Sequence, residues 1–150
     1  MSTAVDTLLA AALAERDDED ACFAFVEQLR EHPDSAAVRA AVESLIDDPD
    51  VHAREVAIDV FHEAGKREAS EEEKRERMAR LLARLDAGET EWRVLESIAY
   101  ACGHLWQEEG AARIAALPAY FPDGVVPGDA RAAAALDLET HDEWVAEDAS

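Results

Sequence analysis

Residues 45–61 read LIDDPDVHAREVAIDVF, and this stretch decides the fold. Its acidic turn, residues 47–50, contains a proline and separates two apolar patterns. After the turn, apolar residues recur at the three- and four-residue spacing of one helix face. The stretch therefore predicts a short turn followed by an amphipathic helix that ends near Gly65, a residue type common just after a helix. The inward face of this helix should consist of Ala53, Val56, Ala57, Val60, Phe61 and Ala64.

The same alternation of helical pattern and short break continues in both directions. Toward the N-terminus it predicts a helix over residues 3–15, a second one before Pro33 and a third that carries the apolar residues of 38–46. Toward the C-terminus a capping box at residues 70–73 opens a fifth helix. Further helices are expected over 91–106, up to Leu117, over about 129–138 and in a short tail after Thr140, with an irregular connection at 118–128.

The helix expected at residues 91–106 is apolar on nearly every side, which is typical of a helix enclosed by its neighbours. Ile98 and Cys102 should therefore be fully buried. The other cysteine, Cys22, also lies in an apolar helical pattern, and we interpret both as small core residues. Unpaired core cysteines indicate a reducing compartment, so we expect a cytoplasmic protein.

Composition supports helix throughout the chain. Alanine, the strongest helix former, occurs 32 times, while the 150 residues include only 6 glycines and 5 prolines. Eight helices joined by short turns form four pairs of 30–40 residues each, and short loops place successive helices antiparallel. The sequence thus predicts an all-α fold: one domain, residues 1–150, built as an α-solenoid of about four antiparallel helix pairs with a short C-terminal helix.

Residues 45–61 resemble the turn and second helix of a HEAT-like repeat. Asp48 and Arg54 have the six-residue spacing that this family uses for a ladder between repeats, and weaker echoes occur at 38–41, 94–105 and 130–134. The resemblance implies a scaffold whose usual work is protein binding, which is an inference from fold alone.

The net charge of −21, from 35 acidic and 14 basic residues, disfavours some partners. Such a field repels phosphate backbones and anionic lipids, so we expect neither nucleic acid nor membrane binding. No apolar run approaches 18 residues, and no basic segment precedes one at the N-terminus. A basic protein is the favoured partner. The alternative is that the acidity reflects a salt-adapted cytoplasm or a GC-rich genome, without a charge-specific partner.

Catalytic and metal-binding motifs are missing from the sequence. None of the five histidines forms an i, i+4 pair, so we predict no metal and no cofactor. HEAT-like di-iron hydroxylases repeat a His-Glu pair four times, whereas His62-Glu63 occurs once here. We therefore expect a protein that is not an enzyme. The alternative is an enzyme or lyase subunit whose site requires a partner or cofactor.

Two surfaces are candidate binding sites. The first is an edge formed by the turns within the helix pairs, which carry 13 acids and a single base, Arg16. Helix capping explains one or two acids per turn but not four in a row at residues 17–20. A solvated capping edge is the alternative interpretation. The candidate binding residues of this edge are Asp17, Asp18, Asp20, Asp47, Asp48, Asp50, Glu89 and Glu91.

The second surface is the outward face of the second helix of each pair. Aligning residues 53–64 with 94–105 places Glu55 beside Glu96 and Asp59 beside Tyr100. An acidic groove with one aromatic anchor suits a basic helix or peptide, although an ordinary polar helix face has the same pattern. The expected function is a protein–protein interaction module, for example an immunity or inhibitor protein that masks a basic enzyme such as a nuclease.

Overall fold

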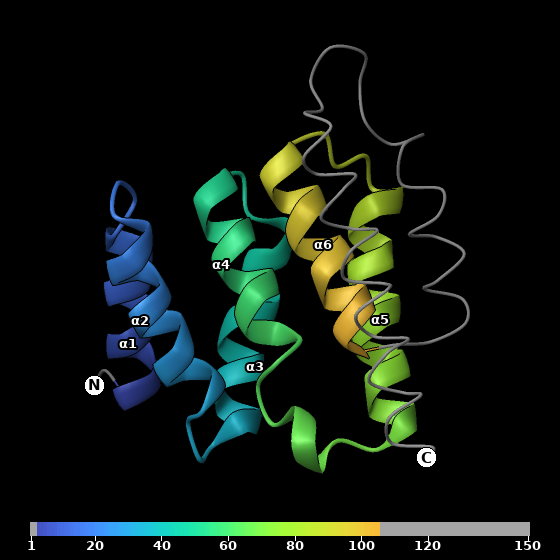
Figure 1. The fold of residues 1–150 in the computed structure, drawn as a ribbon, viewed down its shortest axis with the longest axis horizontal. Helices are drawn as coiled ribbons and strands as arrows, with labels where there is room; N and C mark the ends of the chain where they lie inside the picture. Colours follow the sequence, from blue (N-terminus) through green and yellow to red (C-terminus); the bar gives the residue numbers. More distant parts are fainter. Residues whose placement is uncertain (1–2, 106–150) are drawn as a thin grey trace, which may run out of the picture. The chain divides into compact units, whose positions relative to one another are not determined.

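The computed structural model describes residues 3–105, and all regular structure in this range is helical. Six α-helices and two short 3-10 helices follow one another, with no strand among the described residues (Figure 1). The all-α prediction is confirmed. The predicted helices after residue 105, the irregular connection at 118–128 and the acids Asp123 and Asp129 lie outside the described residues.

The chain divides after Ser70 into two compact units. This division was not expected from the sequence. The N-terminal unit contains α1 (Ala4–Ala14), α2 (Glu19–Arg30), α3 (Ser35–Glu43), η1 (Ser44–Asp47), α4 (Val51–Phe61) and η2 (Lys66–Glu68). The described part of the second unit contains α5 (Glu71–Asp86) and α6 (Trp92–Leu105).

Side-chain caps explain where the helices of the N-terminal unit begin. The hydroxyl of Thr3 accepts the backbone N–H of Asp6, and the Asp6 carboxylate accepts the N–H of Thr3, a complete capping box for α1. The carboxylates of Asp18, Asp34 and Asp50 each accept an N–H from the first turn of α2, α3 and α4. Capping satisfies donors that have no partner inside the helix.

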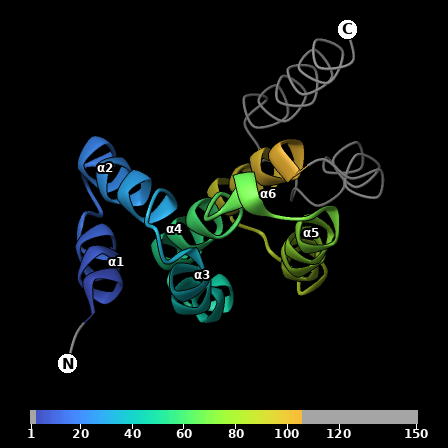
Figure 2. The same ribbon diagram turned by 90° about the horizontal axis from the view of Figure 1, so that it is seen from below.

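The four α-helices of the N-terminal unit share one core. Each of them contacts the other three, and Figure 2 shows α1 and α3 in one layer with α2 and α4 in another. Buried side chains from all four helices fill the space between the layers: Val5, Leu9, Ala12, Val26, Leu29, Val38, Val42 and the inward residues of α4. The helical spacing of these residues in the sequence is the reason that they meet.

α4 is the most enclosed helix of this unit. Its whole predicted inward face is buried, and Ile58, on another side, is fully buried as well. The third predicted helix differs from expectation, since the α-helix ends at Glu43 and η1 carries Leu45 and Ile46. The tighter turn still keeps Ile46 in the core.

The segment after α4 turns sharply at Gly65. Its φ of +66° lies in the left-handed region that glycine adopts without steric cost, as the sequence predicted for a residue near a helix end. The helix itself ends earlier, at Phe61. A Cβ built on Gly65 would lie 2.5 Å from Oγ of Ser35, so the backbone at Gly65 packs against the first residue of α3 with no room for a side chain.

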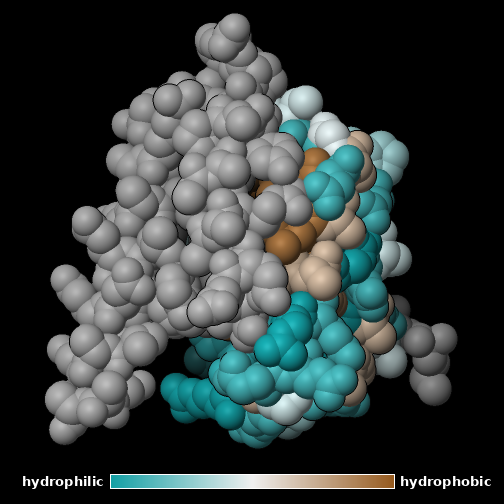
Figure 3. Space-filling model, turned by 90° about the vertical axis from the view of Figure 1, so that its right-hand side faces the viewer, coloured by the Kyte–Doolittle hydropathy of each residue, from teal (hydrophilic) through white to brown (hydrophobic). Residues whose placement is uncertain are grey.

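In the second unit, α5 and α6 pack against each other. Met78, Leu81 and Leu85 of α5 are buried, and Leu82 is half-buried. On α6 the prediction of burial on most sides holds, because Val94, Leu95, Ile98, Ala99, Ala101 and Leu105 are all buried. The side chain of Cys102 lies outside the described part of the chain. On the side of the molecule drawn in Figure 3, the described residues are largely hydrophilic.

Among the described helices, none combines the length and the apolar character needed to span a membrane.

Candidate functional site

Two acidic turns of the N-terminal unit lie together at one end. The turn between α1 and α2 meets the turn before α4, because the guanidinium of Arg16 binds the carboxylate of Asp50 through both Nη atoms, with Nη1 3.1 Å from Oδ1. Figure 1 shows both turns at the same end of the unit. The structure thus brings together six predicted site residues, and we call this surface the acidic edge: Asp17, Asp18, Asp20, Asp47, Asp48 and Asp50.

Half of the acidic edge has a structural role. Oδ1 of Asp18 accepts the N–H of Ala21 at 3.0 Å, and Oδ1 of Asp48 accepts the N–H of Asp50 at 2.9 Å. Asp50 itself caps α4 while it binds Arg16. Asp17, Asp20 and Asp47 are exposed, as is Asp18. Capping therefore explains part of this acidity, and the exposed part supplies a negative surface.

Acids outnumber bases in the two turns of the acidic edge. Residues 15–20 and 43–50 contain nine acids and one base, Arg16. The hydrogen bond from Arg16 lowers the pKa of the Asp50 carboxyl from its ordinary value of 3.8, with a smaller lowering from the backbone N–H of His52. Asp50 is thus ionised at neutral pH, and its charge is balanced by Arg16. The remaining acids give this end of the unit a strongly negative potential.

Arg54 of α4 forms hydrogen bonds with the turn that precedes this helix. It is 8% exposed, and its Nη1 donates to the backbone carbonyls of Asp48 at 2.9 Å and Pro49 at 3.2 Å. The six-residue spacing from Asp48 to Arg54 thus places this guanidinium against the turn's backbone.

α2 and α4 lie side by side, and Glu55 and Asp59 are half-buried on α4. Nε of Arg30 on α2 donates to the backbone carbonyl of Asp59 at 2.9 Å, which ties the two helices together. The predicted groove residues Glu55 and Asp59 act electrostatically on α2 as well. Burial raises the pKa of the Cys22 thiol, and the negative charges of Glu55 and Asp59 raise it further.

Cys22 is only half-buried, so its interpretation as a small buried core residue is wrong. Its thiol donates to the carbonyl of Ala12 at 3.5 Å, and Nε2 of His52 lies 3.2 Å from the same oxygen. Because a carbonyl only accepts, Nε2 of His52 carries a proton. The end of α1 is thus bonded to side chains of both α2 and α4.

Sequence reasoning missed Phe23. This side chain is 51% exposed, and the guanidinium carbon of Arg30 lies 5.8 Å from its ring centroid, a cation–π distance. The helical period could have indicated its exposure. Phe23 lies about a quarter turn away from the apolar stripe of Val26 and Leu29, on the same side of α2 as Arg30.

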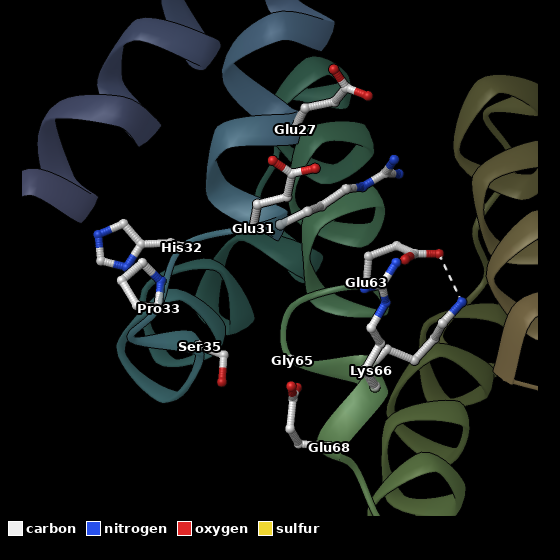
Figure 4. Close-up of a pocket in the computed structure, with 11 residues that line it drawn as sticks. Glu27, Glu31, His32, Pro33, Ser35, Glu63, Gly65, Lys66 and Glu68 are labelled. Atoms are coloured by element: carbon white, nitrogen blue, oxygen red, sulfur yellow. Dashed lines mark hydrogen bonds and ion pairs between the residues drawn. The ribbon is translucent and has the colours of Figure 1, made fainter.

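A pocket with a volume of about 840 Å³ lies at the other end of the N-terminal unit, where α2 and α4 end (Figure 4). It was not predicted from the sequence. Its walls come from the end of α2, the turn into α3 and the segment after α4. The lining residues are Glu27, Arg30, Glu31, His32, Pro33, Ser35, Glu63, Gly65, Lys66, Arg67 and Glu68.

Several polar groups of the pocket are already bonded within the protein. Nζ of Lys66 lies 3.1 Å from Oε1 of Glu63, the pair joined by the dashed line in Figure 4. Nδ1 of His32 accepts the N–H of Asp34 at 3.0 Å. Within the described part of the chain, Glu27, Glu31 and Glu68 form no ion pair. The pocket therefore offers carboxylates to a ligand.

His62, next in sequence to the lining residue Glu63, is fully buried. Its Nδ1 is 2.9 Å from the carbonyl of Ile58, and its Nε2 is 3.4 Å from Oε1 of Glu63. Burial lowers the pKa of His62, more than its contacts with Glu63 and Ile58 raise it, so the ring is neutral at pH 7. Within residues 3–105, no group of three or more His, Cys, Asp or Glu side chains is arranged to hold a metal ion.

The second unit holds the remaining predicted residues. Glu89 is only 3% exposed: its Oε1 accepts Nε of Arg84 at 3.1 Å, and its Oε2 accepts the backbone N–H groups of Thr90 and Glu91. Its carboxylate thus organises the start of α6 and does not face solvent. Glu91 is exposed, Glu96 is half-buried, and Tyr100 is 37% exposed.

No protein-family model, curated protein or solved structure matches this chain.

Proposed function

We propose that this chain is a non-enzymatic protein-binding module, built from HEAT-like antiparallel helix pairs, that binds a basic protein through the acidic edge. One observation carries the proposal: the Arg16–Asp50 ion pair holds two acidic turns together, so nine acids share one end of the N-terminal unit with two arginines, Arg16 and Arg54. In one concrete form, the chain is an immunity or inhibitor protein that masks a basic enzyme.

The packing of the N-terminal unit supports the repeat part of this proposal. Two successive helix pairs, α1 with α2 and α3 with α4, contribute one helix each to two layers. Stacked helix pairs of this kind present turns along one edge and helix faces along another, and both are surfaces for partners.

Charge complementarity supports the partner's chemistry. A patch of exposed carboxylates raises the encounter rate with a positively charged protein, and this effect weakens as salt screens charges beyond about 8 Å at physiological ionic strength. Since Asp17, Asp20 and Asp47 are exposed, their charges act on the solvent side of the edge.

The test is a triple variant, Asp17→Asn, Asp18→Asn and Asp20→Asn. Asparagine keeps the oxygen that caps α2 at residue 18, so we expect a melting temperature equal to the parent's or slightly higher through reduced repulsion. Capture of a basic protein from a lysate of the protein's own cells should occur with the parent at low salt, decrease at high salt and decrease with the variant.

The matched control removes three exposed charges elsewhere, by Glu71→Gln, Glu72→Gln and Glu76→Gln on α5. We expect capture by this control to equal capture by the parent. If the edge variant melts higher but captures the same proteins as the parent, the acidic edge is only a solvated capping surface, as in a salt-adapted protein.

A further inference from the structure

A strip of side chains leads from the exposed ring on α2 to the pocket. Phe23 and Glu27 on α2 and its C-cap residue Glu31 follow one another at four-residue spacing, and all three are exposed. The last two also line the pocket. Residues at this spacing lie on one helix face, so the ring and the pocket are parts of one continuous surface, which we call the α2 strip.

The ring at the start of the α2 strip is held in place by its own unit. Arg30 approaches the ring to 5.8 Å while its Nε is bonded to the carbonyl of Asp59 on α4. Phe23 is nevertheless 51% exposed. A positioned aromatic side chain loses little conformational freedom when a partner covers it, and covering it removes apolar area from water.

The pocket at the other end of the strip favours a cation. Figure 4 shows Glu27 and Glu31 on the α2 side and Glu68 across the pocket. The cations Arg30 and Lys66 are bonded to the Asp59 carbonyl and to Glu63, respectively. Within the described residues the lining cations Arg30 and Arg67 form no ion pair, and the three carboxylates outnumber these two cations.

We propose that the α2 strip and the pocket together bind a basic peptide segment of a protein partner. An apolar or aromatic residue of the segment packs on Phe23, and an arginine or lysine enters the pocket between Glu27, Glu31 and Glu68. This inference rests on the proposed protein-binding function and adds a second surface to it, which runs along α2 to the pocket at the end opposite the acidic edge.

The length of the strip sets the spacing of the two anchors. Eight residues of α-helix separate Phe23 from Glu31, a rise of about 12 Å at 1.5 Å per residue. An extended peptide spans about 3.3–3.6 Å per residue. The apolar anchor and the basic anchor should therefore lie about three to four residues apart in an extended segment.

The test is a titration of the ¹⁵N-labelled full chain with the peptide acetyl-Trp-Ser-Gly-Arg-Arg-amide, followed by NMR. We expect saturable shifts of the amides of Phe23, Glu27, Glu31 and Glu68. Phe23→Ser, and separately Glu27→Gln with Glu31→Gln, should weaken binding about fivefold or more, as for residues at the centre of an interface. These residues are exposed, so both variants should keep the parent's circular dichroism and melting temperature.

Two controls separate this inference from the proposed function. A peptide with glutamates in place of the arginines should give no saturable shift, and the Asp17/Asp18/Asp20→Asn variant should bind the arginine peptide with at most a modest loss. Saturable shifts confined to residues 17–20 and 47–50 would overturn the docking site while leaving the acidic edge in place. The absence of saturable shifts would also overturn it, as would shifts at Phe23 on simple concentration of the protein, which would identify a second copy as the occupant.

Discussion

Arg16 binds both carboxylate oxygens of Asp50, a residue 34 positions later in the chain, while Oδ1 of Asp50 also caps α4. One carboxylate therefore starts a helix and joins that start to the turn after α1. Because both partners are solvent-accessible, water and salt compete with this pair. The main consequence of the pair is that it brings the two turns of the acidic edge together.

The Arg16–Asp50 pair should contribute a small, salt-dependent stability. We expect Arg16→Gln to lower the melting temperature slightly at low salt and not at 1 M salt, because screening weakens exposed pairs. Asp50→Asn should keep the cap and lose the pair. A double-mutant cycle of these two changes, measured by thermal melting, isolates the interaction. Additive effects of the two changes at low salt would contradict the prediction.

The same pair predicts a direction of pH dependence. The pKa of Asp50 is lowered from 3.8 in the folded protein, so the unfolded chain binds its proton more readily. The contribution of Asp50 is complete above pH 3.8 and is lost as the pH falls through the lower, folded pKa. Arg16→Gln should flatten the dependence of the melting temperature on pH in this acidic range.

Gly65→Ala should destabilise the N-terminal unit for two reasons. A left-handed conformation costs a residue with a Cβ about 1–2 kcal/mol, and here the new Cβ would lie 2.8 Å from Cβ of Ser35. We expect a loss larger than the conformational cost alone, measured by urea unfolding.

Gly88→Ala is the matched control for this substitution. Gly88 also has a positive φ, +96°, but a Cβ there would meet nothing within 4 Å, so only the conformational cost applies. Adding Ser35→Gly to Gly65→Ala should recover part of the loss by removing the clashing atoms. If Ser35→Gly recovers nothing in the Gly65→Ala background, the contact with Ser35 is unimportant.

His62 should make the protein less stable in mild acid. Burial lowers its pKa from the ordinary 6.5, so below this value the unfolded chain takes up a proton that the folded chain resists. The stability associated with neutral His62 is thus complete above pH 6.5 and decreases as the pH falls toward the folded pKa. We expect urea midpoints of the parent to fall between pH 6.5 and 5 more steeply than those of His62→Gln. Parallel pH profiles would contradict this prediction.

Ile98→Ala should destabilise the second unit strongly. Ile98 is fully buried, and removing a buried isoleucine side chain to the β-carbon costs about 2–5 kcal/mol through lost burial and the remaining cavity. Leu82→Ala, at a half-buried site on α5, is the control and should cost less. A loss below about 1 kcal/mol for Ile98→Ala, the size of an average substitution, would mean that α6 is peripheral.

Helix positions and buried faces were predictable because both follow from local spacing. The inward residues of α4 and the burial of Ile98 follow directly from the apolar period, and Asp50 marks a helix start by its side-chain chemistry. The boundary after Ser70 was not predictable in this way, because a capping residue looks the same between two units as within one.

The candidate site was less predictable, because it depends on contacts that periodicity does not contain. Glu89 fits the pattern of an exposed acid at a helix start, yet it is buried. Its carboxylate forms an ion pair with Arg84 on the preceding helix. Phe23 reads as one more apolar residue of α2, and its exposure becomes evident only when the packing of α2 on α4 is known. The pocket forms only where the ends of α2 and α4, which are distant in sequence, come together in the fold.

The carbonyl of Ala12 can report spectroscopically on the contacts at the end of α1. It accepts the backbone N–H of Glu15 and bonds to the side chains of Cys22 and His52, so one oxygen senses α1, α2 and α4. A carbonyl that accepts several hydrogen bonds absorbs infrared light at a lower frequency than one that accepts a single bond. Placing ¹³C at this one carbonyl therefore gives a vibrational band whose frequency rises when α2 or α4 separates from α1, without any dye or added tryptophan.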